Sequence, residues 1–323
     1  MALSYEFSIG SVRAKEKSLL SVSDVEQLLA LKSEDELIRY LKDKGYGEGN
    51  TVDEIIESSK KKMWSYIKSV APDFNLFLPF FIQNDVHNLK TVLKGVMSNK
   101  RFEPLIIEPC TVKVEDMKYI VENRRFDKLP EWLGKPADKA YQLLAETKDA
   151  RNSDAIIDRA VLEQLLKEGK NSRSAFLEEY FSTLVFYSDV KIAIRGAKAD
   201  VQKYFYENAL CECRGIDKKQ LIRAAMQGSD AVIKYLEKIN DFDCRKAMEI
   251  YKKSTSDLEK FIDNKLVVLA KQMCRMSSEG PEPLVGYYIG CKYERKLINI
   301  IASGIKTKTP PDKIRERLRE IYG

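Results

Sequence analysis

The sequence predicts an all-α protein made of three similar helical modules, and three observations carry this prediction. The 323-residue chain has 44% hydrophobic and 32% charged residues, with only 15 glycines and 10 prolines, which is typical of a helix-rich globular protein. Apolar residues recur at helical spacing along most of the chain. One helical pattern that ends in a glycine also occurs three times, at intervals of about a hundred residues.

The clearest copy of this pattern covers residues 80–95. Its apolar residues are spaced to fall on one side of a helix: Ile82, Val86, Leu89, Leu93 and Val96. Asp85 and Asn88 lie beside this stripe and, being three residues apart, neighbour each other on the helix. We interpret this pair as polar groups that fix helix packing, because two ligands are too few for a calcium site.

A second copy keeps the stripe and changes the polar pair. Setting Gly196 on Gly95 places this copy over residues 181–196 and puts Phe186 and Asp189 in place of the two polar residues. The stripe itself survives as Tyr187, Val190, Ile194 and Ala197. A pattern that keeps its apolar side while losing its polar residues indicates architecture rather than a repeated active site.

A third, fainter copy ends at Gly304, with Ile298 and Ile301 in its stripe. Here Lys296 stands where we expect an acid, so we expect no role of the polar pair that all three copies share. We predict three homologous modules, with these approximate ranges: residues 1–103, 104–203 and 204–323.

Helix starts near the N-terminus are predicted from capping signals. Residues 4–46 are expected to form two helices, the first marked by Val12, Leu19 and Leu20. Three Ser/Thr and Glu pairs have the spacing of a capping box: Ser23 with Glu26 for residues 25–31, Ser33 with Glu36 for a turn over residues 37–41, and Thr51 with Glu54 for a long helix to Val70. Pro72 ends that long helix.

The strand-like stretch of the sequence is residues 105–114. Pro109 in its middle argues against a central strand, so we expect an extended linker or a short edge. Pro130 and Pro136 are expected to break the helices that follow. The predicted helices cover residues 115–123, 129–133, 137–147, 154–168 and 218–239, then a long helix over residues 256–276 capped by Ser256 and Glu259, and a last one that ends near Gly304.

Positive charge is concentrated near the end of the sequence. Residues 292–323 hold nine basic and four acidic side chains, a net charge of +5 out of +6 for the whole chain. Such a segment could face nucleic acid, anionic lipid or an acidic protein, and a solvated helix face is an equal alternative. No apolar run is long enough for a membrane span and no signal-peptide core is present, so we expect a chain in the cytosol or on its membrane face.

The sequence contains no constellation that predicts an enzyme. Six cysteines without a CxxC pair and a single histidine, His87, offer no zinc set, so reduced and mostly buried thiols are expected. His87 has no serine or cysteine nucleophile in a motif context. The glycine patterns of nucleotide sites are absent, and aromatic residues do not alternate with basic ones as on nucleic-acid platforms. We assign no catalytic, cofactor-binding or metal-ligating residue.

Several segments together carry a resemblance to a known family. They are Tyr5 with Val12-Arg13-Ala14 and Leu19-Leu20, the block from Asp85 to Lys94, Glu108-Pro109-Cys110-Thr111-Val112, and the closing Lys292, Glu294, Asn299 and Gly304. On these residues the chain resembles the C subunits of the bacterial and archaeal V-type (A-type) ATPases, which are the counterparts of the d subunit of the eukaryotic vacuolar proton pump. The resemblance is collinear over nearly the whole chain, and the block from Asp85 to Lys94 is its specific part.

The resemblance implies a funnel of three helical modules with pseudo-threefold symmetry that acts as a non-catalytic socket. Its mouth would receive the central rotor stalk formed by the D and F subunits, and its base would sit on the membrane ring of proteolipid subunits. Torque would pass through it during proton or sodium transport. The chain would then be a peripheral part of the complex on the cytoplasmic face of the membrane, with no cofactor.

Two alternatives stay open. One is a stand-alone helical scaffold that uses the same fold for another partner. The other is a basic nucleic-acid-binding helical protein, which predicts salt-sensitive binding to DNA or RNA. The socket predicts no such binding.

Overall fold

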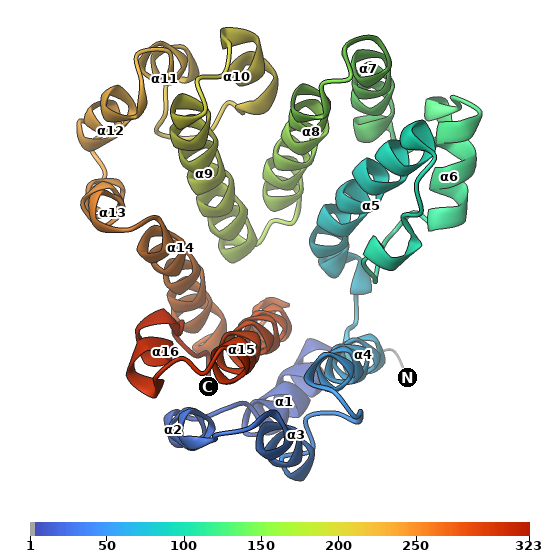
Figure 1. Ribbon diagram of the computed structural model, residues 1–323. Helices are drawn as coiled ribbons and strands as arrows, with labels where there is room; N and C mark the ends of the chain where they lie inside the picture. Colours follow the sequence, from blue (N-terminus) through green and yellow to red (C-terminus); the bar gives the residue numbers. More distant parts are fainter. Residues whose placement is uncertain (1–3) are drawn as a thin grey trace. The chain divides into compact units, whose positions relative to one another are not determined.

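A computed structural model describes residues 4–323 of the chain (Figure 1). All regular elements in this range are helices and none is a strand, which confirms the predicted all-α class. The chain divides into two compact units. The first unit joins Met1–Phe74 to Glu249–Gly323, and the second is Asn75–Met248. The predicted ranges of three modules stay a prediction.

The first unit is built from both ends of the chain. Its helices are α1 (Tyr5–Glu16), α2 (Val22–Ala30), α3 (Glu34–Asp43), α4 (Val52–Val70), α14 (Thr255–Ala270), α15 (Glu282–Lys306) and α16 (Pro311–Arg317). A π-helical turn, η4 (Lys271–Arg275), continues α14. Within the unit, α15 packs on α1, α3, α4, α14 and α16, so this helix from the end of the chain organises those from its beginning.

Aliphatic residues from both chain ends share the core of the first unit. Leu28, Leu37 and Ile55 from the N-terminal helices are fully buried in one cluster with Ile298 and Ile301 of α15. Burial of a leucine or isoleucine side chain contributes roughly 1.5–3 kcal/mol. The two stretches of chain therefore stabilise each other.

The second unit contains three long helices with shorter ones beside them. Its elements are η2 (Glu103–Leu105) and η3 (Phe126–Lys128), both of 3-10 type, and the helices α5 (Leu78–Ser98), α6 (Val114–Glu122), α7 (Glu131–Thr147), α8 (Ala150–Asn171), α9 (Ala175–Lys198), α10 (Lys203–Ala209), α11 (Lys218–Ala225) and α12 (Ser229–Glu237). Two further elements cross the unit boundaries: η1 (Phe74–Phe77) and α13 (Phe242–Lys253). Helix α8 packs on α5, α7, α9 and α10, so it lies at the centre of the second unit.

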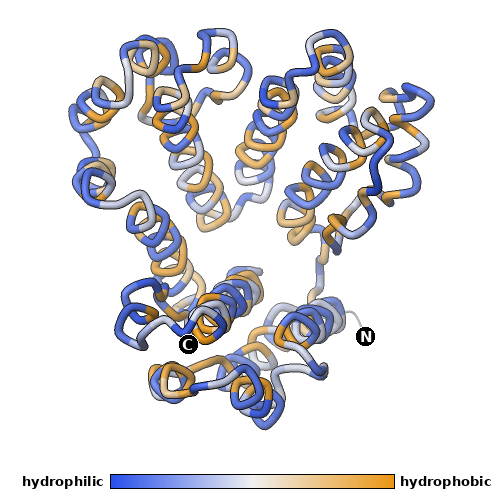
Figure 2. The backbone as a smooth tube through the Cα atoms, viewed as in Figure 1, coloured by the Kyte–Doolittle hydropathy of each residue, from blue (hydrophilic) through white to orange (hydrophobic). Residues whose placement is uncertain are grey.

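The predicted apolar stripes are the buried sides of α5, α9 and α15. Of the α5 stripe, Ile82, Val86, Leu89 and Leu93 are buried, and Val96 is half-buried. Hydrophobic and hydrophilic residues alternate along the coils of α5 and α9 in Figure 2, as expected for helices with one buried side. The periodicity therefore predicted these helices and their orientation correctly.

Two of the predicted capping residues, Ser23 and Ser256, are wrong by two positions. The side chain that caps α2 is Ser21, which accepts from Asp24 N, while the Asp24 carboxylate accepts from Ser21 N; this is a complete capping box. Likewise Ser254, not Ser256, caps α14. Ser33 and Thr51 cap α3 and α4 as predicted. Both errors have the same cause. The Ser-x-x-Glu spacing points to Ser23 and Ser256, whereas the third residue of each helix is an aspartate, Asp24 in α2 and Asp257 in α14.

Other boundaries also differ from the prediction. Residues 4–46 form three helices rather than two, and Leu19 and Leu20 lie beyond the end of α1. Pro136 does not break its helix, because α7 runs through it from Glu131 to Thr147. Residues 106–113 are an extended connection without strand pairing, as Pro109 indicated.

Candidate functional site

The polar side of α5 is occupied by the extended segment that follows the helix. Asp85 is 1% exposed and accepts hydrogen bonds from the backbone N–H groups of Thr111 at 2.7 Å and Val112 at 3.1 Å. The Thr111 hydroxyl also donates to this carboxylate. Burial raises the pKa of Asp85, and these three hydrogen bonds oppose the rise. The Asp85 carboxylate therefore holds the backbone of the segment that follows α5.

Neighbouring residues of α5 extend the same contact. The Asn88 side chain donates to Ile107 O and accepts from Ile107 N, each at 2.9 Å. Asn84 donates to Pro109 O at 2.7 Å. One turn of α5 therefore holds residues 107–112 in place. Asp85 and Asn88 are buried polar groups, as we interpreted them, but they bind this connecting segment and not a neighbouring helix.

His87 of α5 extends the same contact. Its Nε2 lies 2.9 Å from Leu105 O, so the tautomer with hydrogen on Nε2 donates to this carbonyl. That bond continues the hold on the extended segment toward η2.

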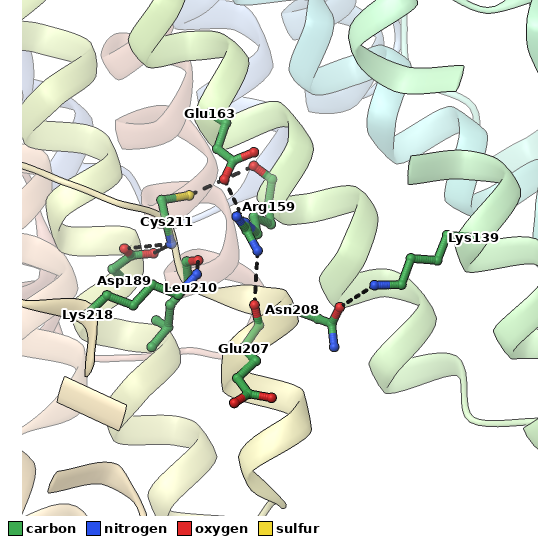
Figure 3. Close-up of polar contacts among 9 residues, drawn as sticks. All are labelled: Lys139, Arg159, Glu163, Asp189, Glu207, Asn208, Leu210, Cys211 and Lys218. Carbon is green, nitrogen blue, oxygen red and sulfur yellow. Dashed lines mark hydrogen bonds and ion pairs between the residues drawn. The ribbon is translucent and has the colours of Figure 1, made fainter. Parts of the chain in front are cut away.

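Helix α9 carries a second buried carboxylate in the same relation to the chain that follows it. Asp189 is 1% exposed and accepts from Cys211 N, 3.0 Å from Oδ2 and 3.3 Å from Oδ1. Figure 3 shows the carboxylate directed at this amide. Burial raises the pKa of Asp189 to about 7, and the hydrogen bonds with Cys211 and Cys213 limit the rise.

Charged side chains of α8 and α11 complete the network in Figure 3. Arg159 donates to Glu163 Oε1 at 2.6 Å and to Glu207 O at 3.0 Å, which ties α8 to α10. Lys218 donates to Leu210 O. Both cations bind backbone oxygens, and Arg159 also binds a carboxylate. The network therefore connects α8 with α10, and α11 with the residue that follows α10.

Helix α15 carries a third buried carboxylate. Setting Gly304 on Gly95 places Glu294 at the position of Asp85. Glu294 is 3% exposed and accepts from the backbone N–H of Leu20, which follows α1. Burial raises the pKa of this carboxyl to about 8. The expectation that Lys296 replaces the acid is wrong, because the acid lies two residues earlier.

A role shared by the three helices therefore exists, contrary to our expectation from the altered polar pair. Each of α5, α9 and α15 uses a buried carboxylate to accept a backbone N–H from a segment outside the helix. Asp189 stands one turn later than Asp85, at the position of Asn88. The sequence comparison missed this role because a residue-by-residue match does not allow the acid to move by one turn.

The glycines used to align the copies also have one role. Each lies on a buried helix face where an added Cβ would come closer than 3.0 Å to a large side chain further along the chain. The three pairs are Gly95 with Phe102, Gly196 with Tyr206 and Gly304 with Ile314. Glycine is required there because the side chain packs directly on the helix backbone.

Sequence reasoning missed a set of contacts that join the two chain ends. Arg13 donates to Cys274 O at 3.0 Å and to Ser277 O at 2.7 Å, at the end of the π-helical turn. It also pairs with Glu16, which accepts from the Tyr322 hydroxyl at 3.1 Å. Arg13 is one of the residues that carry the family resemblance, and its role is to hold these backbone carbonyls.

Several basic residues near the end of the chain are engaged within the first unit. Arg315 pairs with Glu26 of α2, with 2.7 Å between Nη2 and Oε2. Arg319 donates to Asp263 of α14 at 2.9 Å, and Lys296 also pairs with Asp263. These residues stabilise contacts between helices.

Within the described residues, the potential metal ligands are dispersed and burial makes the thiols poor nucleophiles. No set of three or more His, Cys, Asp or Glu side chains within residues 4–323 could hold a metal ion. All six cysteines are free, and burial raises the thiol pKa of each, to about 12 for Cys244 and Cys291. Within the same range no helix is both long and apolar enough to cross a membrane.

The fold and its polar contacts define an all-helical protein whose buried polar groups hold backbone segments, and comparison with known proteins gives its family. The ATP synthase (C/AC39) subunit family matches residues 8–317, so the chain belongs to this family. It is 20% identical to the C subunit of the V-type sodium ATPase of Enterococcus hirae over 319 residues, which cover 96% of this chain and 97% of that protein. It is 22% identical to the C subunit of the A-type ATP synthase of Methanocaldococcus jannaschii over 353 residues, which cover 97% of this chain and 86% of that protein.

Proposed function

We propose that this chain is the non-catalytic socket of a rotary V-type ATPase or ATP synthase. It links the shaft formed by the D and F subunits to the membrane proteolipid ring and transmits torque for proton or sodium transport. The observation that carries the proposal is the family match over residues 8–317. The two relatives, C subunits of a V-type sodium ATPase and of an A-type ATP synthase, support it.

The contacts within each unit suit a part that transmits force without chemistry. Each of the three buried carboxylates on α5, α9 and α15 accepts a backbone N–H group, and the raised thiol pKa values disfavour the cysteines as nucleophiles. Close packing of helices on glycine gives low compliance inside a unit. A compliant element would absorb torque, and these contacts oppose that.

The repeated glycine and carboxylate contacts on α5, α9 and α15 support three homologous modules. We propose that these modules form a pseudo-threefold funnel on the cytoplasmic face of the membrane. In this arrangement the funnel mouth receives the D and F shaft and its base contacts the proteolipid ring.

Binding to the central stalk tests the proposed function. The full chain, co-expressed with the D and F subunits from the same source, is expected to be recovered with them in a stoichiometric complex at physiological salt. Recovery of D and F without this chain would contradict the proposal. Salt-sensitive shifting of DNA or RNA in a gel by the chain would instead favour the nucleic-acid alternative.

Part of the basic C-terminal segment is free to meet a partner. Lys306, Lys308 and Arg317 are exposed and form no ion pair with any other residue between 4 and 323. Because Arg315 and Arg319 are engaged within the unit, changing them would disturb the fold itself. We propose that the three free cations contact an acidic stalk end or anionic headgroups.

Charge reversal of these three residues tests that contact. The triple variant with Lys306, Lys308 and Arg317 each changed to Glu should bind the stalk or the membrane sector more weakly, with the largest difference at low salt, and should keep the wild-type Tm. The matched control reverses three exposed cations of the second unit: Arg214, Lys219 and Arg223. Equal binding of both variants to stalk and membrane sector would refute the contact.

A further inference from the structure

The first unit contains a cavity of about 350 Å³ between α1, α4, α15 and the end of α3. Its size is at the lower end of small-molecule sites, which run from about 300 to 1,000 Å³. Its lining includes three lysines, Lys15, Lys44 and Lys62, and several hydroxyl groups that can donate hydrogen bonds, among them those of Ser18, Tyr46 and Ser59. We call this cavity the lysine pocket.

Two of the three lysines of the lysine pocket have no carboxylate partner among the described residues. Lys44 pairs with Asp24. Lys15 and Lys62 have no ion pair with any residue that the structure describes, and the nearby Glu16 is engaged by Arg13. Lys15 instead lies over the Tyr66 ring, 5.8 Å from its centroid. Two lysines without carboxylate partners at one concave site favour an anionic ligand.

The floor of the pocket is compatible with an anion. The Tyr46 hydroxyl is buried beside Ser59 and makes no hydrogen bond of ordinary geometry, so one buried donor there lacks a partner. Buried polar groups are normally paired, by protein or by a bound species. Burial also raises the pKa of Glu294 to about 8, which favours the neutral carboxyl over a carboxylate that would repel an anion.

The remaining wall is apolar and aromatic. Tyr66 and Tyr287 pack edge to face with ring centroids 5.5 Å apart, and Leu19 and Met63 lie in the same lining. A bare inorganic ion would leave this wall unused. An organic phosphate would contact both sides of the pocket: its phosphate group would bind the lysines, which interact with phosphate as point charges, and its organic part would pack on the tyrosines.

We propose that the lysine pocket binds the phosphate group of a small organic phosphate. Lys15 and Lys62 hold the charge, the hydroxyls of Tyr46 and Ser59 donate to phosphate oxygens, and the tyrosine wall packs on the organic part. The proposal is independent of the socket function, because it rests on residues inside the first unit alone. A soluble phosphomonoester and a phospholipid headgroup share the chemistry that it recognises.

Calorimetric titration of the full chain at 150 mM salt tests the proposal. The probes are inorganic phosphate, AMP, glycerol 3-phosphate, and vesicles of phosphatidylcholine with 20% phosphatidic acid. An organic phosphate is expected to bind more tightly than inorganic phosphate and to raise the Tm by several degrees. The variants Lys15→Ala and Lys62→Ala should each weaken binding at least tenfold. Lys61→Ala, which removes a neighbouring exposed lysine of α4, should not.

The outcomes separate the two sources of phosphate and the failure of the idea. Binding to AMP or glycerol 3-phosphate that needs Lys15 and Lys62 assigns a soluble ligand. Binding to phosphatidic acid vesicles alone, with the same dependence, assigns a lipid headgroup. The proposal would be overturned if no probe bound at 5 mM, or if Lys61→Ala weakened binding as much as Lys15→Ala and Lys62→Ala do. Recovery with the D and F subunits is measured separately and does not affect this result.

Discussion

At the scale of single residues, glycine and buried acids decide how each long helix contacts the chain that follows it. Gly95, Gly196 and Gly304 could be found from the sequence because glycine is conspicuous and the spacing of the copies is regular. Their function could not, because it depends on Phe102, Tyr206 and Ile314, which differ in type and in distance along the chain. Because the partner of each glycine is a different residue type, these contacts produce no repeated sequence pattern.

Replacement of Gly95 by alanine should destabilise the second unit. The new Cβ would lie 2.4 Å from Phe102 Cδ1 and 2.9 Å from Phe102 Cβ, so the ring and its backbone must move. Overpacking of this kind costs about 1–3 kcal/mol. Urea denaturation of Gly95→Ala followed by circular dichroism measures the change.

Gly10 provides the control for that substitution. It is an exposed residue of α1 with no atom within 4 Å of an added Cβ. Alanine there should stabilise the protein by about 0.5–1 kcal/mol, because glycine has the greater backbone freedom in the unfolded chain. A Gly95→Ala variant as stable as Gly10→Ala would refute the packing role of Gly95.

Asp189 makes stability depend on pH. Its pKa is raised to about 7 from the usual 3.8, so between these values the folded state holds a proton that the unfolded state has lost. The contribution of Asp189 to the free energy of unfolding is therefore fully present below about pH 4. It falls as the pH rises from about 4 to 7 and does not recover above pH 7. The Tm of the second unit should fall across this range.

Asp189→Asn should remove that part of the pH dependence. Asparagine already serves at the corresponding position of α5, where Asn88 Oδ1 accepts from Ile107 N at 2.9 Å. The Tm difference between variant and wild type should grow in favour of the variant as pH rises from 5 to 8. A difference that is constant with pH would contradict the assignment.

At the scale of elements, apolar periodicity predicted the long helices well and the connections poorly. The stripes of α5, α9 and α15 follow from Val86, Val190, Ile298 and their neighbours, because burial of one helix side imposes a period that is visible in one sequence. The hold of α5 on residues 107–112 was not predictable in detail. Its hydrogen bonds end on backbone groups, whose position depends on the fold rather than on side-chain identity.

Loss of the Asp85 carboxylate should release the extended segment from α5. Asp85→Ala leaves the part-buried N–H groups of Thr111 and Val112 without this acceptor, and loss of hydrogen bonds to a charged group costs roughly 1.5–3 kcal/mol. Limited proteolysis should then cut residues 105–113 sooner than in the wild type.

Asp85→Asn is the matched variant, because its amide oxygen can still accept one of these bonds. It should lie between Asp85→Ala and the wild type in both Tm and rate of cleavage. Wild-type stability and wild-type cleavage in Asp85→Ala would show that the contact does not hold the segment.

At the scale of the whole chain, each of the two units has its own core. The first unit depends on its C-terminal residues: an added Cβ on Gly286 or Gly290 would meet Tyr322, while Ile314 and Leu318 join the main aliphatic cluster. The sequence does not predict this arrangement, because no local pattern records that residues 4–74 and 249–323 share a core.

Removal of residues 311–323 should therefore unfold the first unit and leave the second unit folded. Hydrogen exchange with mass spectrometry should show lost protection in α1 to α4, with α5, α8 and α9 unchanged. The variant Tyr322→Phe, which keeps the ring and loses only the hydroxyl contact with Glu16, should retain protection in both units. Equal protection of α1 to α4 in the truncated and full chains would contradict the shared core.

The shared core of the two chain ends also has a consequence for synthesis on the ribosome. Leu28, Leu37 and Ile55 leave the ribosome long before their partners on α15 exist. At 5–20 residues per second, translation of the intervening second unit takes roughly 9–35 s. During that time the second unit can fold while the first 74 residues remain without their core partners. In the cell, a chaperone that covers these aliphatic side chains during that time would protect the nascent chain from aggregation.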